Sequence, residues 1–203
     1  MADVSMELVK KLRDMTGAGM MDCKRALEES EADLDKAVVW LREHGISKAA
    51  KRAGRETSNG IVEAYLHRTG DYPPQVGALI ELNCESDFVA KGDDFRALAR
   101  ELAMHIAAAA PRWVSREDVP EDLLREERDL YQRKAEQDGK PAQAIPKIVE
   151  AQVEAFVKDH CLLEQPYVRD QKTPIRNLIA ETVAKLQENI TVRRFCRFSI
   201  KEG

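Results

Sequence analysis

The chain has 203 residues, of which 43% are apolar and 33% are charged, and its formal net charge is -4 at pH 7. Such a composition is typical of a compact soluble protein and excludes a largely disordered chain. The small acidic excess disfavours the basic surface of a nucleic-acid-binding protein, so we expect no nucleic-acid partner. No apolar run is long enough for a signal peptide or a membrane span. We therefore expect a cytoplasmic protein with no membrane partner.

In the first part of the chain, apolar residues recur at helical spacing in three groups within residues 4–42, which predicts three short helices. The glycine-rich segment 16–19 permits a reversal after the first helix, and Asp33 is expected to cap the third. His44-Gly45 is interpreted as the end of that helix. The basic, alanine-rich segment 47–56 is predicted to be a partly helical linker.

Two runs rich in β-branched and aromatic residues, 61–67 and 76–83, flank the turn-forming cluster RTGDYPPQ, which predicts a hairpin. The second run is apolar on both faces, which is typical of a central strand covered on both sides. The last segment, ITVRRFCRFSI over residues 190–200, is predicted to be a strand that returns to the hairpin. Helical patterns cover most of the remainder, namely 94–110, 123–136, 142–158 and 175–188.

These elements together predict an α+β fold with two domains. The first, over residues 1–55, is a small helical domain with its basic linker. The second, over residues 56–203, is a core in which helices cover a three-stranded antiparallel sheet.

The segment TGAGMMDC is rich in glycine, but it follows no strand and lacks the Gly-Lys-Ser/Thr of a phosphate-binding loop. We interpret it as a turn between two helices. Met20 and Met21 are adjacent on a helix and therefore point about 100° apart, so they are not expected to be equally buried. Two interpretations stay open: both fill the core, or one of them is presented to a partner protein.

The basic linker carries Lys48, Lys51, Arg52 and Arg55, which we interpret as solvated charges rather than phosphate contacts. The four cysteines, Cys23, Cys84, Cys161 and Cys196, form no C-x-x-C pair, and no histidine stands at metal-ligand spacing from them. We expect free thiols in a reducing compartment, with neither a metal site nor a cofactor.

The sequence contains few groups of residues that could form a catalytic site. Cys84, Asp87 and His105 supply the residue types of a cysteine-nucleophile site, but nothing in the sequence places His105 against Cys84. We therefore do not expect an active-site cysteine, although an enzyme that uses Cys84 stays open at this point.

The segment NCESDFVAKGDDF, residues 83–95, carries Phe88 within a turn-like acidic stretch. One interpretation is a strand-to-helix connection in which Phe88 folds under the core and Asp87 or Asp93 caps the next helix. The competing interpretation is a loop that projects an aromatic side chain into a partner's pocket. The residues alone favour the first.

Three segments carry a resemblance to a known family. LVKKLRDMTGAGMMDCKRAL over residues 8–27, ELNCESDFVAK over residues 81–91 and VRRFCRF over residues 192–198 resemble the bacterial elongation factor Ts family. Their order and separation also fit that family, so the resemblance covers nearly the whole chain.

The resemblance implies a guanine nucleotide exchange factor, not an enzyme, for elongation factor Tu in its GDP-bound and nucleotide-free states. It implies that a three-helix domain similar to ubiquitin-associated domains docks on this GTPase, with Arg13, Met20 and Met21 at the contact. It further implies that a second site promotes GDP release during translation elongation. At that site Asp87, Phe88 and Val89 would disturb the Mg²⁺ and phosphate site of the GTPase.

The sequence departs from the family pattern at two points. Ser86 stands where the family usually has Thr, which keeps the hydroxyl and loses a methyl group. The chain also has room for one core subdomain, and short members are expected to form homodimers, for which the strand around Cys196 is a candidate contact. The alternative function is a non-exchange adaptor that binds another protein through its helical domain and dimerises through its core.

Overall fold

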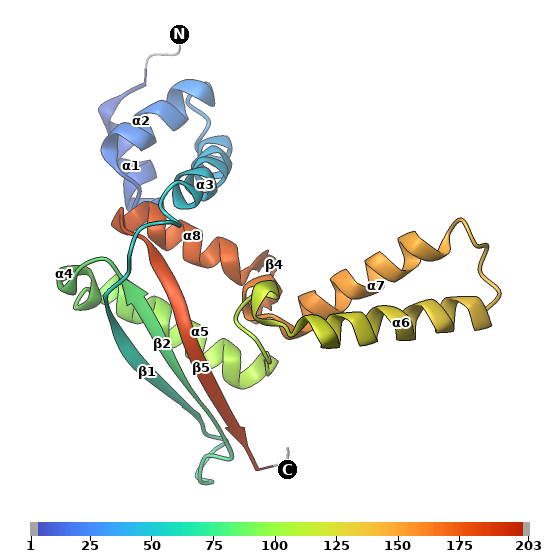
Figure 1. The fold of residues 1–203 in the computed structure, drawn as a ribbon. Coiled ribbons are helices and arrows are strands. Elements are labelled where there is room, and N and C mark those ends of the chain that lie inside the picture. Colours follow the sequence, from blue (N-terminus) through green and yellow to red (C-terminus); the bar gives the residue numbers. More distant parts are fainter. Residues whose placement is uncertain (1–3, 201–203) are drawn as a thin grey trace. The chain divides into compact units, whose positions relative to one another are not determined.

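The computed structural model describes residues 4–200, apart from the side chain of Lys48. Figure 1 labels its helices and strands. The contacts divide the chain into two compact units, and we describe each by itself: unit 1 comprises Met1–Val62, Glu81–Ala99 and Asn177–Thr191, and unit 2 comprises Glu63–Ile80, Arg100–Arg176 and Val192–Gly203. The boundary near residue 55 between a helical domain and a core stays a prediction.

The three predicted N-terminal helices are present in unit 1 as α1 (Met6–Thr16), α2 (Met20–Glu29) and α3 (Leu34–Ala50) (Figure 1). Their shared core consists of small and medium apolar side chains at helical spacing: Val9, Leu12, Cys23, Ala26, Leu27 and Ala37. Gly17 ends α1 with a φ of 67°, the left-handed conformation that glycine adopts without strain. The expected cap of α3 is confirmed, because the Asp33 side chain accepts a hydrogen bond from the backbone N–H of Lys36 at 3.0 Å.

The predicted end of the third helix at His44-Gly45 is wrong, because α3 continues to Ala50. Tertiary packing explains the continuation. Gly45 is buried, and a Cβ placed on it would lie 3.3 Å from the Cβ of Ala184. Arg42 Nε, one turn earlier, lies 2.6 Å from Glu181 Oε1. Both partners belong to α8 (Ile175–Leu186), so glycine at this position permits close helix packing and does not end the helix.

The predicted three-stranded antiparallel sheet is confirmed, and with it the α+β class. It consists of β1 (Asn59–His67), β2 (Val76–Cys84) and β5 (Ile190–Ser199) in the order β1-β2-β5, with β2 in the centre (Figure 1). β2 has one buried face, formed by Ala78, Ile80, Leu82 and Cys84. Leu79 on its other face is 44% exposed, so the expectation that this strand is covered on both sides is wrong.

Two helices follow β2 where the sequence predicted one. α4 (Asp87–Ala90) is a single turn, and after it α5 (Asp93–Ala109) carries a stripe of buried residues: Phe95, Leu98, Ala99, Leu102, Ala103, Ile106 and Ala107. The buried stripe confirms the long helix predicted over 94–110. The short turn was missed because four residues are too few to show a helical period.

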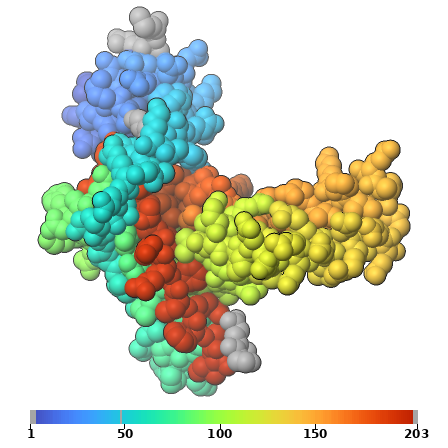
Figure 2. All heavy atoms as spheres, in the orientation of Figure 1, coloured from blue at the N-terminus to red at the C-terminus, as the bar shows by residue number. Residues whose placement is uncertain are grey.

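In unit 2, α6 (Glu121–Gln137) and α7 (Ile145–His160) pack side by side as a helical hairpin (Figures 1 and 2). Their apolar contact centres on buried residues of both helices and the segments beside them: Val119, Leu124, Val149, Val153, Phe156, Val157 and Cys161. Two short strands, β3 (Pro166–Tyr167) and β4 (Asp170–Pro174), pair after the hairpin and were not predicted, because they are short and mostly polar. Within the described residues, every helix is too short or too polar to cross a lipid bilayer.

His105 of α5 is completely buried in unit 2 and makes two hydrogen bonds. Its Nδ1 accepts from the backbone N–H of Val168 at 3.3 Å, and its Nε2 lies 2.9 Å from Gln165 Oε1. The side-chain nitrogen of Gln165 donates to the carbonyl oxygen of Asp159 at 2.7 Å, so its oxygen is the group that accepts from His105. This arrangement requires neutral imidazole with its proton on Nε2.

We expect the free energy of unfolding to fall as the pH drops below about 6.5, because burial lowers the pKa of His105 in the folded state. The unfolded chain then binds a proton that the folded chain does not, and stability changes by at most about 1.4 kcal/mol per pH unit from this group. The ring of Tyr167 lies 6.2 Å from that of His105, centroid to centroid. The hydroxyl of Tyr167 donates to Glu101, which also pairs with Arg169.

Urea denaturation at pH 7.5, 6.5 and 5.5 measures this dependence, with His105→Gln as the control that removes the titrating group. If the free energy of unfolding falls as steeply between pH 6.5 and 5.5 in the variant as in the wild type, the assignment to His105 is contradicted.

Candidate functional site

The first candidate site is the turn α4, which presents an aromatic side chain to solvent. Phe88 is 83% exposed, so the interpretation that it folds under the core is wrong. The next two residues, Val89 and Ala90, are only 8% and 7% exposed and point inward. One turn of helix thus holds Phe88 outward while its neighbours anchor the turn in unit 1.

Ser86 caps this turn, since its Oγ accepts a hydrogen bond from the backbone N–H of Val89 at 3.3 Å. The hydroxyl group, which Ser86 shares with the threonine that is usual at this position in the family, therefore caps α4. Asp87 is exposed beside Phe88, and its Oδ2 lies 2.7 Å from Nζ of Lys91. The hydrogen bond from Lys91, together with its charge, lowers the pKa of the Asp87 carboxyl, so Asp87 is ionised at neutral pH.

The three residues that the resemblance assigns to this site thus differ in exposure. Asp87 and Phe88 are exposed, whereas the side chain of Val89 is buried and faces the interior of unit 1. Of the three, Asp87 and Phe88 have side chains that are exposed enough to contact a partner directly. Their role in binding stays a prediction.

The second candidate site lies on α1 and α2, also in unit 1. Met21 is 74% exposed, whereas Met20 is half-buried and packs against the core of the three helices. The two methionines are therefore unequally buried, as their helical geometry predicts. Arg13 near the end of α1 is exposed. An exposed flexible apolar side chain with a cation on the neighbouring helix is chemically suited to a protein contact.

The basic linker is engaged within unit 1. Arg52 donates to Oε1 of Gln187 at 2.6 Å, and Arg55 Nη1 lies 3.4 Å from Oε1 of Glu85. Lys51 is exposed, and the side chain of Lys48 lies outside the described part of the chain. The two arginines thus hold the chain between α3 and β1 in place.

Cys84 and His105, two of the residues considered for a cysteine-nucleophile site, have structural roles instead. Cys84 is completely buried, and burial raises the pKa of its thiol to about 11, so it is a protonated thiol at neutral pH and a poor nucleophile. His105 is held by Gln165 and Val168, as described above. Among the residues that the structure describes, no group of three or more His, Cys, Asp or Glu side chains has an arrangement that holds a metal ion.

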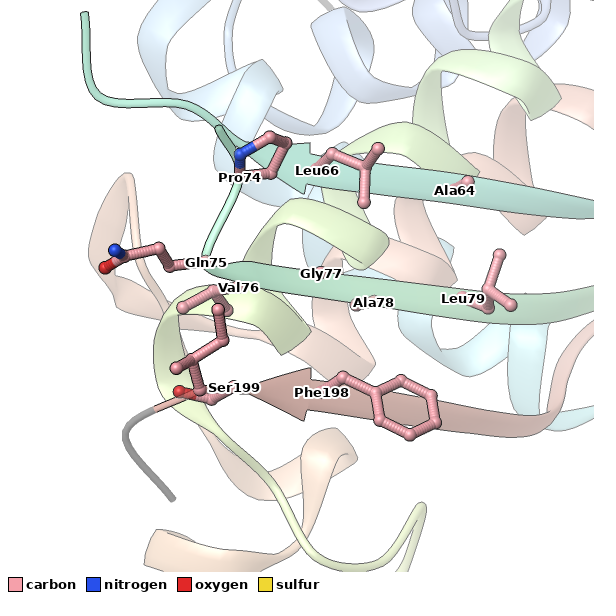
Figure 3. Close-up of a pocket in the computed structure, with 11 residues that line it drawn as sticks. Ala64, Leu66, Pro74, Gln75, Val76, Gly77, Ala78, Leu79, Phe198 and Ser199 are labelled. Carbon is pink, nitrogen blue, oxygen red and sulfur yellow. The ribbon is translucent and has the colours of Figure 1, made fainter. Parts of the chain in front are cut away.

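A third surface, which we call the open sheet face, was not recognised in the sequence. It is an apolar groove in unit 2 of about 530 Å³, lined by the ends of β1, β2 and β5. Figure 3 shows Leu66, Leu79 and Phe198 on these three strands, and they are 59%, 44% and 74% exposed. Ile200 also lines the groove and is 75% exposed. Alternate apolar residues in the hairpin and in the last strand are the sequence signal for this face.

Cys196 belongs to the last strand and is exposed. β5 is an edge strand of the sheet. Because side chains two residues apart point to the same side of a strand, Cys196 shares the face of Phe198. The candidate dimer-contact residue, Cys196, thus lies on the same face of the sheet as the apolar groove.

Comparisons with known proteins define the class of this chain. The family model described as "Elongation factor TS" matches residues 4–202. Elongation factor Ts of Fervidobacterium nodosum is 50% identical over 200 residues, which cover 98% of this chain and 100% of the relative. Elongation factor Ts of Frankia alni is 51% identical over 204 residues, which cover 100% of both chains. That of Carboxydothermus hydrogenoformans is 49% identical, with 98% of this chain and 90% of the relative covered.

The chain is therefore a translation elongation factor, a protein of protein biosynthesis. It belongs to the elongation factor Ts family, which confirms the resemblance found in the sequence.

Proposed function

We propose that the protein is a guanine nucleotide exchange factor for elongation factor Tu and promotes GDP release during elongation. The observation that carries this proposal is the exposure of Phe88 on a capped, anchored turn. Membership of the elongation factor Ts family supports it. The factor makes and breaks no covalent bond in this role, and it acts in the cytoplasm, where elongation takes place.

The proposed mechanism follows from how a GTPase holds its nucleotide. Backbone amides of the phosphate loop and Mg²⁺ together neutralise the phosphates of GDP, so release requires all these contacts to be lost. Phe88 inserts as a wedge beside this site, Asp87 repels groups around the metal, and Val89 anchors the turn that carries them. Because coupling between two ligands is reciprocal, rebinding of a nucleotide weakens the binding of the factor and expels it.

The test is the release of a fluorescent GDP analogue from elongation factor Tu, measured by stopped flow with and without this protein. We expect the release rate to rise with the concentration of the factor and to saturate. No acceleration, combined with recovery of some other protein in a pull-down, would overturn the proposal in favour of an adaptor.

We further propose that α1 and α2 dock on the GTPase through Arg13, Met20 and Met21. Met21→Asp is expected to weaken binding about 10-fold, because an apolar contact is replaced by a charge that must be desolvated. The fold is expected to persist, since Met21 is 74% exposed. Titration calorimetry with nucleotide-free elongation factor Tu measures the affinity.

The matched control is Val39→Asp, which places the same charge at another exposed apolar residue, on α3, where 55% of Val39 is accessible. Equal losses of affinity in the two variants, or none in Met21→Asp, would refute the docking role of α1 and α2.

We also propose that two copies of the chain form a homodimer through the open sheet face, with Cys196 at the contact. The support is the row of exposed apolar side chains that crosses all three strands, Leu66, Leu79 and Phe198. An apolar face of this kind is typical of a protein interface. Because a second copy carries the same face, it offers a partner surface of matching chemistry.

A further inference from the structure

We propose that Glu188 is a positioning residue that fixes the direction in which α4 presents Phe88. The inference rests on the proposed exchange function. It concerns two neighbouring chain junctions of unit 1, one between β2 and α4 and the other between α8 and β5. Each junction carries a carboxylate that binds the backbone of the other, and we call this arrangement the reciprocal carboxylate clamp, formed by Glu85 and Glu188.

Glu188 holds the junction that leads into α4. Its Oε2 accepts hydrogen bonds from the backbone N–H groups of Glu85 at 3.1 Å and of Ser86 at 3.0 Å. Its Oε1 accepts from Oγ of Ser86 at 2.5 Å. The same Oγ caps α4 by accepting from Val89. One carboxylate therefore binds two amides and the capping hydroxyl in the two residues that immediately precede α4.

Glu85 binds in the opposite direction. Its Oε1 accepts from the backbone N–H of Asn189 at 2.6 Å. Asn189 is 4% exposed, and its side chain donates to the carbonyl oxygen of Arg55 at 2.8 Å. The side chain of Asn59 donates to the carbonyl oxygen of Glu85, also at 2.8 Å. The clamp thus joins the start of β5 and the segment after α3 to the junction that carries α4.

The dependence of α4 on this clamp follows from its length. A single helical turn does not sustain itself, because helix nucleation is unfavourable and is repaid only by later residues. Amides without a partner in a partly buried position are unfavourable as well. Removing the carboxylate of Glu188 leaves the N–H groups of Glu85 and Ser86 without an acceptor in the protein, so they must hydrogen-bond to water. The hydroxyl of Ser86 is then no longer held in the orientation that caps α4. Phe88 then samples several directions.

The test measures stimulated GDP release and separates the maximal rate from the factor concentration that gives half of it. Glu188→Ala is expected to lower the maximal rate about 10-fold and to change the half-saturating concentration less than about 2-fold, since the docking helices are untouched. Glu188→Gln keeps an oxygen acceptor and is expected to restore most of the rate. Glu56→Ala, which removes an exposed carboxylate from the same unit, is the matched control and is expected to behave as wild type.

A double-mutant cycle separates positioning from general stabilisation. If Glu188 acts through Phe88, adding Glu188→Ala to Phe88→Ala lowers the maximal rate no further. If the two losses instead multiply, Glu188 acts elsewhere and the inference is overturned. An unchanged maximal rate in Glu188→Ala would also overturn it, provided that Phe88→Ala slows release.

Amide hydrogen exchange of the full chain without the GTPase keeps the two proposals distinguishable. Residues 85–90 are expected to exchange faster in Glu188→Ala than in Glu56→Ala, while α5 and β2 keep their protection. Unchanged protection of residues 85–90 would overturn the clamp. If Phe88→Ala has no effect on release, the wedge mechanism fails, and this measurement still decides whether Glu188 holds the turn.

Discussion

Replacement of Phe88 with alanine is expected to slow stimulated GDP release about 30-fold at saturating factor. Loss of a central aromatic contact typically removes about 2 kcal/mol of interaction free energy, and each 1.36 kcal/mol corresponds to about a tenfold change in rate. The backbone of α4 and the Asp87–Lys91 ion pair are expected to stay in place, so that the variant lacks only the aromatic side chain. Stopped-flow release of a fluorescent GDP analogue measures the rate.

The stability of this variant is expected to match that of the wild type, because Phe88 is 83% exposed and contributes little to the core. Tyr72→Ala is the matched control, since Tyr72 is a 75% exposed aromatic in the β1–β2 turn. A release rate of Phe88→Ala equal to that of wild type would eliminate the wedge, and an equal loss in Tyr72→Ala would show that the effect is not specific to α4.

If the protein forms the proposed homodimer, Phe198→Asp is expected to convert it to a monomer at micromolar concentration. The change puts a charge into an apolar contact that the symmetry of a dimer repeats twice, so each dimer buries two uncompensated carboxylates. The fold is expected to survive, since the side chain is 74% exposed in the single chain. Sedimentation equilibrium measures the association state directly.

Leu130→Asp is the corresponding control, because Leu130 is 49% exposed on α6 and lies outside the open sheet face. Two results would contradict the proposed interface: a wild-type chain that sediments as a monomer, or a Phe198→Asp variant that still sediments as a dimer.

Much of the fold was predictable from the sequence, because its signals are local. The helical spacing of apolar residues gives α1 and α2, and glycine at position 17 marks the reversal between them. The β-branched runs give β1, β2 and β5, and the expected central position of β2 is confirmed, whereas the expected cover on its second face is wrong. The capping role of Asp33 was predictable as well, because it depends only on the next turn of the chain.

Other features depend on contacts between distant segments and were missed for that reason. Gly45 looks like a helix end, but its packing against Ala184 of α8 extends the helix to Ala50. The exposure of Phe88 depends on its place in a single turn whose anchors are Val89, Ala90 and the carboxylate of Glu188, about 100 residues later in the chain. Residue types alone favoured a buried Phe88, because large aromatic side chains are usually buried.

The contrast between Phe88 and its neighbour has a consequence for how variants of this protein are selected. Val89 is 8% exposed and Phe88 is 83% exposed, although one peptide bond joins them. Substitutions at position 89 are expected to lower the amount of folded protein in the cell, whereas substitutions at position 88 are expected to leave that amount unchanged and to affect the proposed exchange function. On this expectation, two adjacent codons affect the abundance and the activity of the protein separately.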